Sequence, residues 1–392
     1  MIKSVGECFY QIQNGANIKQ GEVDGGFPIT RIETTANDKF NRDRMGYAGI
    51  TYITQYESYV LEDGDLLMSH INSVQYLGRT VLYVKQPNET IIHGMNLLRL
   101  KANKDVIDPA YAKYYFNGHL FRSELGKITK KSVNQASFTV KDLKKIKIVI
   151  PPMSEQERIV FVLDKIKVVI DNYQKQLEKY DELIKARFVE MFGDPITNPM
   201  RWKLTTIGDE CYYIKDGPHK SLPDIGINNG GYPLISVRNI VNKNIDFSTA
   251  RYISKEDYVN AIKKCNPEKG DILYSKGGTT GIAKLVDIDK KFANWVHVAV
   301  LKFDKTKLSG LFFENMLNNY YCYEQSQRFT KGIANRDLVL SSIANIQIYI
   351  PPIELQNQFA DFVKQIDKSK FVEEKNLIIM CKIKRSFYYD QF

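Results

Sequence analysis

A long internal repeat is the feature that most limits how this chain can fold. Residues 146–166 read IKIVIPPMSEQERIVFVLDKI, and two hundred positions later residues 346–366 read IQIYIPPIELQNQFADFVKQI. In both copies a strand-like run, a Pro-Pro pair and the start of a helix follow one another in the same order. Self-similarity at a long spacing indicates a duplicated structural unit, so we expect two related halves.

The similarity extends through both halves. GDLL at 64–67 is matched by GDIL at 270–273, and VGE at 5–7 is matched by IGD at 207–209. The offset between matched positions drifts, as loop insertions in two diverged copies would produce. In each half, short runs rich in β-branched and aromatic residues alternate with Gly, Pro and Asn, a pattern typical of strands.

Helical segments are also expected in each half. Shorter ones lie near residues 109–122 and 311–328, and a long amphipathic segment follows each Pro-Pro pair. After the first pair, apolar residues recur at alternating steps of four and three, at Ile159, Leu163, Ile166, Ile170, Tyr173, Leu177, Tyr180 and Ile184. This heptad pattern predicts a coiled-coil-like helix that starts at Ser154, with Glu157 completing a capping box, and ends near Met191.

The segment after the second Pro-Pro pair has a similar but less regular apolar face. It carries Phe359, Val363, Ile366, Leu377, Met380 and Phe387. We expect the two helices to pair antiparallel; the alternative is that each packs only on its own domain. The predicted fold is α+β, with two homologous globular domains separated by two long antiparallel helices and related by a pseudo-twofold internal repeat.

The distribution of charge indicates what the two blocks bind. The chain has a formal net charge of +10, and residues 1–150 hold 20 basic against 15 acidic residues. Residues 195–350 hold 21 basic against 15 acidic residues. A basic excess in both large blocks favours a polyanionic partner. No apolar run approaches the roughly 18 residues that a membrane helix needs, so a cytoplasmic protein is expected.

The motifs of several enzyme classes are missing. Ser275-Lys276-Gly277-Gly278-Thr279-Thr280-Gly281 is rich in glycine, but its lysine precedes the glycines, unlike the lysine of a phosphate-binding P-loop. The five histidines and five cysteines are scattered without metal-ligand spacing. The sequence therefore favours a binding protein over an enzyme, with no metal and no catalytic residue.

The repeated segments resemble the specificity subunit of type I DNA restriction-modification systems. The resemblance covers the whole chain and is carried by the two Ile-x-Ile-x-Ile-Pro-Pro segments, Glu155-Gln156 with Leu355-Gln356, and FVEMFGD at 188–194. The matched Gly-Asp-(Leu/Ile)-Leu segments and Lys331-Gly332-Ile333-Ala334-Asn335 fit it too. One departure is Leu355-Gln356-Asn357, where the first copy has Glu155-Gln156.

The resemblance implies a division of the chain and a set of partners. Two target recognition domains, 1–150 and 196–350, would each read one half of a bipartite, asymmetric sequence in double-stranded DNA. The conserved helices, 151–195 and 351–392, would dock two modification subunits, which methylate an adenine in each half-site, and motor-nuclease restriction subunits would join them. This chain would bind no cofactor; S-adenosylmethionine and ATP with Mg²⁺ would act on the partner subunits.

Candidate DNA contacts fall into two classes, because phosphate contacts fix position and base contacts specify sequence. For phosphates, the segment 127–147 carries seven lysines against one acid, Asp142. The candidates are Lys127, Lys130, Lys131 and Lys331, and Lys331 matches Lys131 in the repeat. A solvated lysine-rich face is the alternative interpretation.

For base readout, we expect exposed loops that carry amides, hydroxyls or cations. Those after the matched Gly-Asp strands differ in sequence between the halves, as an asymmetric target requires. Arginine reads guanine and asparagine reads adenine in the major groove, which adds further positions. The candidates are Arg31, Ser69, His70, Asn72, Arg238, Asn239, Lys276 and Thr279. A scaffold of two domains that binds proteins instead of DNA remains the alternative function.

Overall fold

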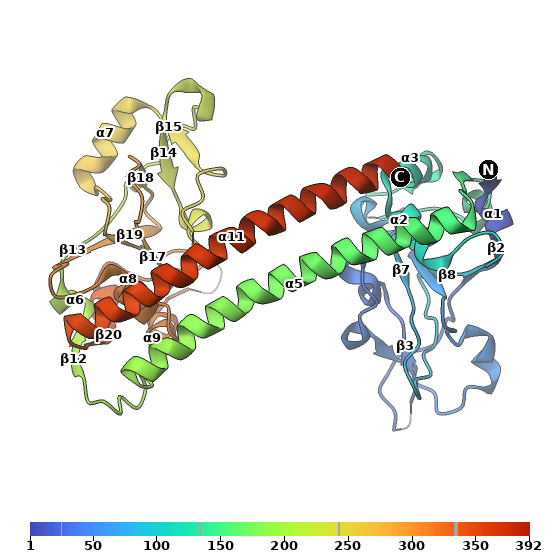
Figure 1. The fold of residues 1–392 in the computed structure, drawn as a ribbon, viewed down its shortest axis with the longest axis horizontal. Coiled ribbons are helices and arrows are strands. Elements are labelled where there is room, and N and C mark those ends of the chain that lie inside the picture. Colours follow the sequence, from blue (N-terminus) through green and yellow to red (C-terminus); the bar gives the residue numbers. More distant parts are fainter. Residues whose placement is uncertain (25, 134, 242–243, 333–335) are drawn as a thin grey trace. The chain divides into compact units, whose positions relative to one another are not determined.

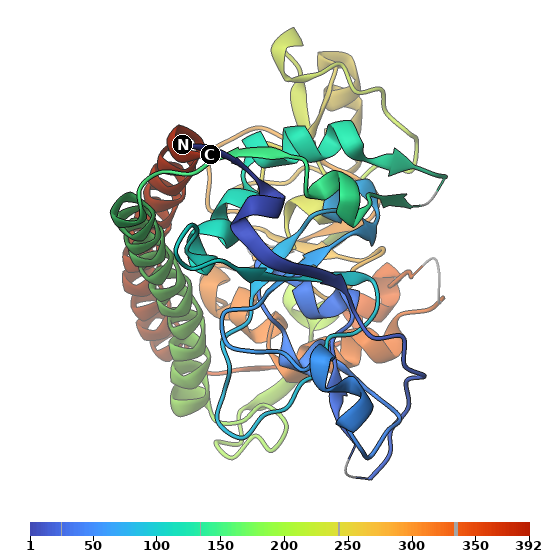
Figure 2. The ribbon, with the colours of Figure 1, turned by 90° about the vertical axis from the view of Figure 1, so that its right-hand side faces the viewer.

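Two compact units make up the chain. The structure, a computed structural model, describes residues 1–24, 26–133, 135–241, 244–332 and 336–392. The first unit comprises Met1–Tyr173 with Asn376–Phe392, and the second comprises Gln174–Lys375. Both chain termini lie in the first unit (Figure 2). Each unit contains one copy of the repeat and a part of each of the two long helices (Figure 1).

Each unit is built on a four-stranded antiparallel sheet with the same strand order. The sheet of the first unit has the order β2-β8-β5-β7 and that of the second has the order β13-β19-β16-β17. In the first unit the strands are Phe9–Asn14 (β2), Leu97–Ala102 (β8), Leu66–Ser69 (β5) and Thr80–Leu82 (β7). In the second unit they are Cys211–Asp216 (β13), Val298–Phe303 (β19), Ile272–Ser275 (β16) and Ala283–Leu285 (β17). The internal repeat is therefore a repeat of topology.

The strand before each Pro-Pro pair closes its unit in the same way. Lys147–Val149 (β11) pairs antiparallel with Ile2–Ser4 (β1), and Gln347–Ile350 (β20) pairs antiparallel with Lys203–Thr206 (β12). The alternating isoleucines of both copies point into the cores, because side chains alternate between the two faces of a strand.

Short helices cover the sheets at matched positions. The predicted helical segments each form two helices, which are Pro109–Asn117 (α2) with His119–Ile128 (α3), and Gly310–Leu317 (α8) with Tyr320–Phe329 (α9). The break in the first unit falls at Gly118. In the second unit Asn319 starts α9 by accepting a hydrogen bond from the Cys322 N–H, which ends the continuity with α8. One-turn helices complete the match: Val5–Cys8 (α1) and Val140–Leu143 (α4) in the first unit, and Ile207–Glu210 (α6) and Leu340–Ala344 (α10) in the second.

The two long helices are Met153–Phe192 (α5) and Ile353–Gln391 (α11). Helix α5 begins one residue before the predicted start, so Ser154 lies inside the first turn and is not its cap. The Pro152 carbonyl accepts the first backbone hydrogen bonds of the helix, from the Glu155 and Gln156 N–H groups. The proline pair therefore both ends the strand and begins the helix.

The long helices run antiparallel and pack against each other. In the second unit, Ile184, Phe188 and Phe192 near the end of α5 share a core with Phe359 and Val363 near the start of α11. In the first unit, the start of α5 shares a core with Phe387 and Tyr388 at the end of α11 and with Phe392, which follows it. Of the predicted seam positions, Ile159, Leu163, Ile166, Ile170 and Ile184 are buried and Tyr173, Leu177 and Tyr180 are partly buried. The prediction of paired antiparallel helices is confirmed.

The units differ most in the elements beside the sheet. The second unit has a small sheet of Arg251–Ile253 (β15), Tyr232–Ile235 (β14) and Ala293–Asn294 (β18), with the helix Lys255–Lys264 (α7). The first unit has a short pair, Pro28–Ile29 (β3) with Gly46–Tyr47 (β4), and 3₁₀ turns between residues 32 and 59. The two units thus share a framework and carry different surfaces.

Candidate nucleic-acid interface

The predicted phosphate contacts and the predicted reading segment meet in the first unit. Lys130–Lys131 (β9) pairs with Ala136–Ser137 (β10), and β10 pairs on its other side with Ile71–Asn72 (β6). We name this three-stranded element, β6-β10-β9, the first ribbon. Segments some 60 residues apart in sequence are therefore held side by side by backbone hydrogen bonds.

The second unit repeats this arrangement. Lys331 and Asp337 exchange two backbone hydrogen bonds of 2.9 Å each, and Asp337 also forms a bridge to Gly277. The Leu338 N–H donates to the Lys276 carbonyl at 2.7 Å. We name residues 275–279 with 331–332 and 336–338 the second ribbon. Ile333, Ala334 and Asn335 of the predicted motif lie outside the described residues.

The four predicted phosphate lysines are solvent-exposed. Lys127 lies in the last turn of α3 and forms an exposed ion pair with Glu124 at 2.6 Å, while Lys130 and Lys131 lie in the first ribbon. Lys331 occupies the corresponding place in the second ribbon. An exposed ammonium group on a β-ribbon can reach a phosphate oxygen while the backbone pairing holds its base in place.

For three predicted base readers the expected exposure is wrong, because their side chains are buried and engaged within the protein. Ser69 is fully buried and its hydroxyl donates to the Tyr76 carbonyl at 2.6 Å. Asn239 is buried, and its amide spans a turn by accepting from the Ser236 N–H and donating to the Asp246 carbonyl. Each of these polar groups is hydrogen-bonded within its own loop, so it is not available to an external partner.

Lys276 is the third of these. It is 6% exposed, and its Nζ lies 3.1 Å from Asp337 and 3.6 Å from Asp216. Asp216 also binds Lys264 at 2.8 Å. Lys276 thus fastens the second ribbon to the sheet and does not present its ammonium group to bases.

The side chain of His70 is neither fully buried nor fully exposed. Its ring is half-buried against Phe138, with the ring centroids 6.3 Å apart. Burial lowers the pKa of His70. Its backbone carbonyl accepts the Phe138 N–H at 3.3 Å, which joins the residues next to the first ribbon.

The remaining base-readout candidates keep surface positions. Thr279 is exposed in the second ribbon, and Asn72 is half-exposed in the first, where its Oδ1 accepts a hydrogen bond from the Ser73 N–H. Arg31 and Arg238 are exposed but belong to other elements, where they bond Gln20 and the Thr249 carbonyl, respectively. The ribbons therefore bring together Asn72 with the lysines of the first unit, and Thr279 with Lys331 of the second.

Gln75, which the sequence did not single out, is a further candidate beside the first ribbon. It is exposed on the 3₁₀ turn Val74–Tyr76 and lines, with Lys131, a hollow of about 360 Å³ against α3. Arg122 of α3 holds this turn by donating to the Leu77 carbonyl. A glutamine amide can read adenine, and its place just after the matched strand β5 was the available signal.

Two tests for other kinds of site give negative results. Within the described residues, no group of three or more His, Cys, Asp or Glu side chains is placed to hold a metal ion. No helix in that part of the chain is long and apolar enough to cross a membrane.

Both halves of the chain match the same protein family. The family described as type I restriction modification DNA specificity domain is matched at residues 2–179 and again at residues 199–379. These two ranges agree with the two copies of the sheet framework. Each copy therefore corresponds to one domain of that family.

Individual relatives are similar over most or part of the chain. The type I restriction enzyme MjaX specificity subunit, so named in Methanocaldococcus jannaschii, is 28% identical over 374 residues, which cover 93% of this chain and 86% of the relative. The EcoKI specificity subunit of Escherichia coli is 24% identical over 196 residues, 49% of this chain and 42% of the relative.

Solved structures share the fold. The S subunit of a type I restriction-modification system from M. genitalium aligns with a TM-score of 0.59 at 14% identity, covering 100% of this chain and 96% of that chain. A chain from a structure of type I restriction-modification complex assembly aligns with a TM-score of 0.54 at 15% identity, covering 99% of this chain and 96% of that chain.

Proposed function

This chain belongs to the type I restriction modification DNA specificity family, and we propose that its two units read the two halves of a bipartite, asymmetric DNA sequence. It is a specificity subunit, the component that recognises the DNA target. The first ribbon, with Asn72 and Gln75, contacts the bases of one half-site. The second ribbon, with Thr279, contacts the bases of the other.

The pair of ribbons is the observation that carries this proposal. Their backbones are alike, since Lys131 and Lys331 each begin a short β-pairing that docks on the segment after a Gly-Asp strand. Their outward side chains differ, with Asn72 in one and Thr279 in the other. A shared framework with different reading residues is what recognition of two unlike half-sites requires.

The chain acts, in this proposal, as a non-catalytic recognition subunit in the cytoplasm. Two modification subunits dock on α5 and α11, bring S-adenosylmethionine and methylate an adenine in each half-site. Restriction subunits with ATP and Mg²⁺ join them. Apolar side chains exposed on both long helices support such docking, including Phe161 and Val168 on α5 and Phe371 and Val372 on α11.

A methylation map tests the proposal. The chain is co-expressed with the modification subunit of the same host in cells that lack methylation of their own, and methylated adenines are mapped across the genome. The expected result is one split motif with two defined halves and an undefined spacer. Replacing residues 69–79 by the corresponding loop of another specificity subunit should change only one half of the motif.

The protein-binding scaffold, our alternative from sequence, predicts a different map. Methylation would then be absent, or would keep the same motif when either ribbon is altered. Such a result would contradict DNA reading by the ribbons.

A further inference from the structure

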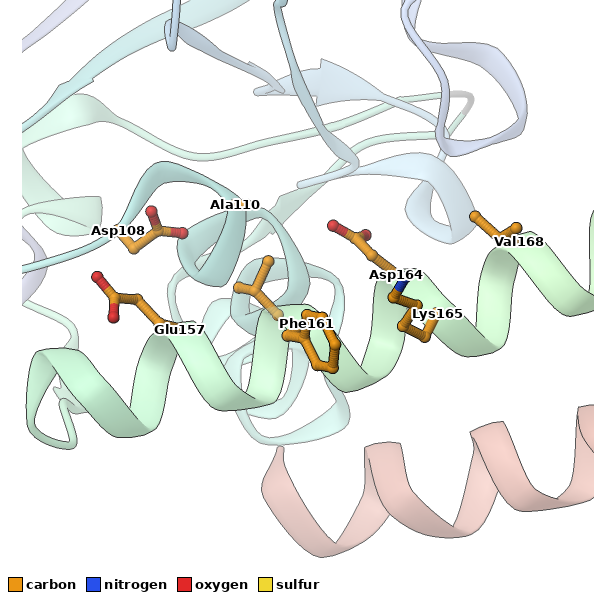
Figure 3. A pocket seen from close by; sticks show the side chains of 8 residues that line it. Asp108, Ala110, Glu157, Phe161, Asp164, Lys165 and Val168 are labelled. Carbon is orange, nitrogen blue, oxygen red and sulfur yellow. The ribbon is translucent and has the colours of Figure 1, made fainter.

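A groove on the first unit is open at the surface and lined by both apolar and acidic side chains. It has a volume of about 440 Å³ and lies between the first turns of α5 and the start of α2 (Figure 3). Phe161 is 62% exposed and Val168 is 54% exposed along it, and Val160 of α5 lines it while packing against the core of the unit. Large apolar side chains left this open next to a hollow mark an interaction surface.

Three carboxylates give the groove a negative charge. Asp108 and Glu157 lie at one end, and Asp164 lies further along α5 toward Val168 (Figure 3). Asp108 accepts the Tyr111 N–H at 2.8 Å, and Asp164 accepts the Tyr114 hydroxyl at 2.5 Å, so these two carboxylates are fixed in place. Lys165, whose Nζ lies 5.4 Å from the centre of the Phe161 ring, is the one cation among the lining residues.

The matched face of the second unit has the opposite chemistry. Residues of α5 and α11 can be matched one to one. Gln156 and Gln356 make equivalent hydrogen bonds, and Leu163 and Val363 both face a core. Asp361 then replaces Phe161, and an ion pair of 2.9 Å joins it to Lys364, which replaces Asp164. At the other groove positions of the helix, Asn357 replaces Glu157, Ala360 replaces Val160, Gln365 replaces Lys165 and Lys368 replaces Val168.

We propose that the groove of the first unit binds a basic segment of a modification subunit through an apolar side chain seated beside Phe161, and that the matched face of the second unit does not bind that segment. The inference rests on the proposed function, because the occupant is the modification subunit. The carboxylates repel a polyanion such as DNA and favour a cationic protein segment. Two identical modification subunits therefore dock with unequal strength.

Titration of the full-length chain with the modification subunit of the same host, followed by native mass spectrometry, measures both docking steps. The wild-type chain is expected to bind two subunits, with one step tighter than the other. Replacing Phe161→Asp and Val168→Lys gives the groove the residues of the matched face. This variant should weaken the tighter step about 30-fold or more, as loss of a central apolar anchor does.

The matched control is Asp361→Ala with Lys368→Ala on the second unit, which should leave the tighter step within about threefold of wild type. The single change Val168→Lys, at an exposed position, serves as a second variant, and unchanged thermal unfolding verifies folding. Salt should weaken the tighter step more than the other, because its partners are charged.

Several outcomes would overturn the inference and leave the proposed function standing. These are two equal docking steps in the wild type, a groove variant that binds both subunits as the wild type does, or an equal loss in the control. A wild-type chain that self-associates through Phe161 would assign the groove to a second copy. If the wild-type chain binds no modification subunit at all, the docking of modification subunits stated in the proposed function is contradicted, and not only the role of the groove.

Discussion

Gln156 and Gln356 make the same three hydrogen bonds in the two units. The Oε1 of Gln156 accepts the Asp108 N–H at 2.9 Å, and its Nε2 donates to the Val106 and Pro151 carbonyls at 3.0 Å each. Gln356 repeats this with the Ser309 N–H at 2.8 Å and with the carbonyls of Lys307 and Pro351. Both amides are buried. Each long helix is thereby joined to the start of a short helix of its unit, α5 to α2 and α11 to α8.

Removal of either amide should therefore loosen one unit and spare the other. Gln156→Ala leaves the partly buried Asp108 N–H and two carbonyls without this partner, at a cost of about 2–3 kcal/mol. Hydrogen exchange followed residue by residue should show faster exchange at Asp108 and unchanged exchange at Ser309. Gln356→Ala should give the reverse.

The control for this prediction is Gln358→Ala, at an exposed position on α11. It should leave both amides unchanged, as surface substitutions usually do. Faster exchange at both sites in either single variant would show that the two amides do not act locally.

The repeat and the helix seam could be predicted from sequence because both leave a periodic pattern. Ile159 and Leu163 face the core of the first unit, and Phe359 and Val363 face that of the second, at the heptad steps that the sequence displays. Local spacing determines which face of a helix is apolar, so no tertiary information is needed. The break of each predicted shorter helix into two was missed, since nothing periodic marks it.

The function of the matched Gly-Asp segments could not be predicted, because it depends on contacts between distant strands. Asp65 accepts the Glu62 N–H at 2.7 Å and lies 3.8 Å from buried Arg99. Asp271 accepts the Glu268 N–H at 2.8 Å and lies 2.6 Å from Lys302. The sequence shows the repeated acid, whereas only the fold shows the cation on the neighbouring strand.

The same limit explains why three residues expected on exposed loops are buried. Ser69, Asn239 and Lys276 are polar residues near loops. The sequence does not distinguish a polar loop residue that faces solvent from one that bonds to its own turn. The pairing of Ala136 with both Lys131 and Asn72, which brings these two residues into one ribbon, also escaped prediction, because two-residue strands carry no periodic signal.

Acid should weaken the first unit through Glu89. Two hydrogen bonds from Arg42, of 2.7 and 2.9 Å, together with donors from Gln86 and Tyr83, lower the pKa of Glu89 to about 2. In the unfolded chain this pKa is about 4.3, so the contribution of Glu89 is complete above about pH 5 and is lost as the pH falls toward 2.

Urea unfolding at a series of pH values tests this. Glu89→Gln removes the charge that Arg42 binds, so the variant should be less stable than wild type at neutral pH, and the difference should shrink between about pH 5 and pH 2. Glu22→Gln, at an exposed position, is the matched control and should follow the wild-type curve. A constant difference across this window would contradict the assignment.

Loss of a phosphate lysine should weaken binding to all DNA sequences alike. Lys131→Ala or Lys331→Ala is expected to reduce the slope of log affinity against log salt concentration by about 1, because one fewer counterion is released. Fluorescence anisotropy with target and random duplexes measures both effects. Lys145→Ala, an exposed lysine of the same basic segment outside the ribbon, is the control and should keep the wild-type slope.

Alteration of a reading residue should instead change one half of the recognised sequence. Asn72→Ala or Gln75→Ala should relax one base position in the half-site of the first unit, at a cost of about 1–3 kcal/mol for the preferred base. Thr279→Ala should relax a position in the other half-site. Selection from a randomised duplex library, with the holo complex as bait, identifies the affected positions. The two ribbons lie in separate units, so their effects should add in the double variant Asn72→Ala with Thr279→Ala. If both single changes alter the same half-site, the assignment of one ribbon to each half is wrong.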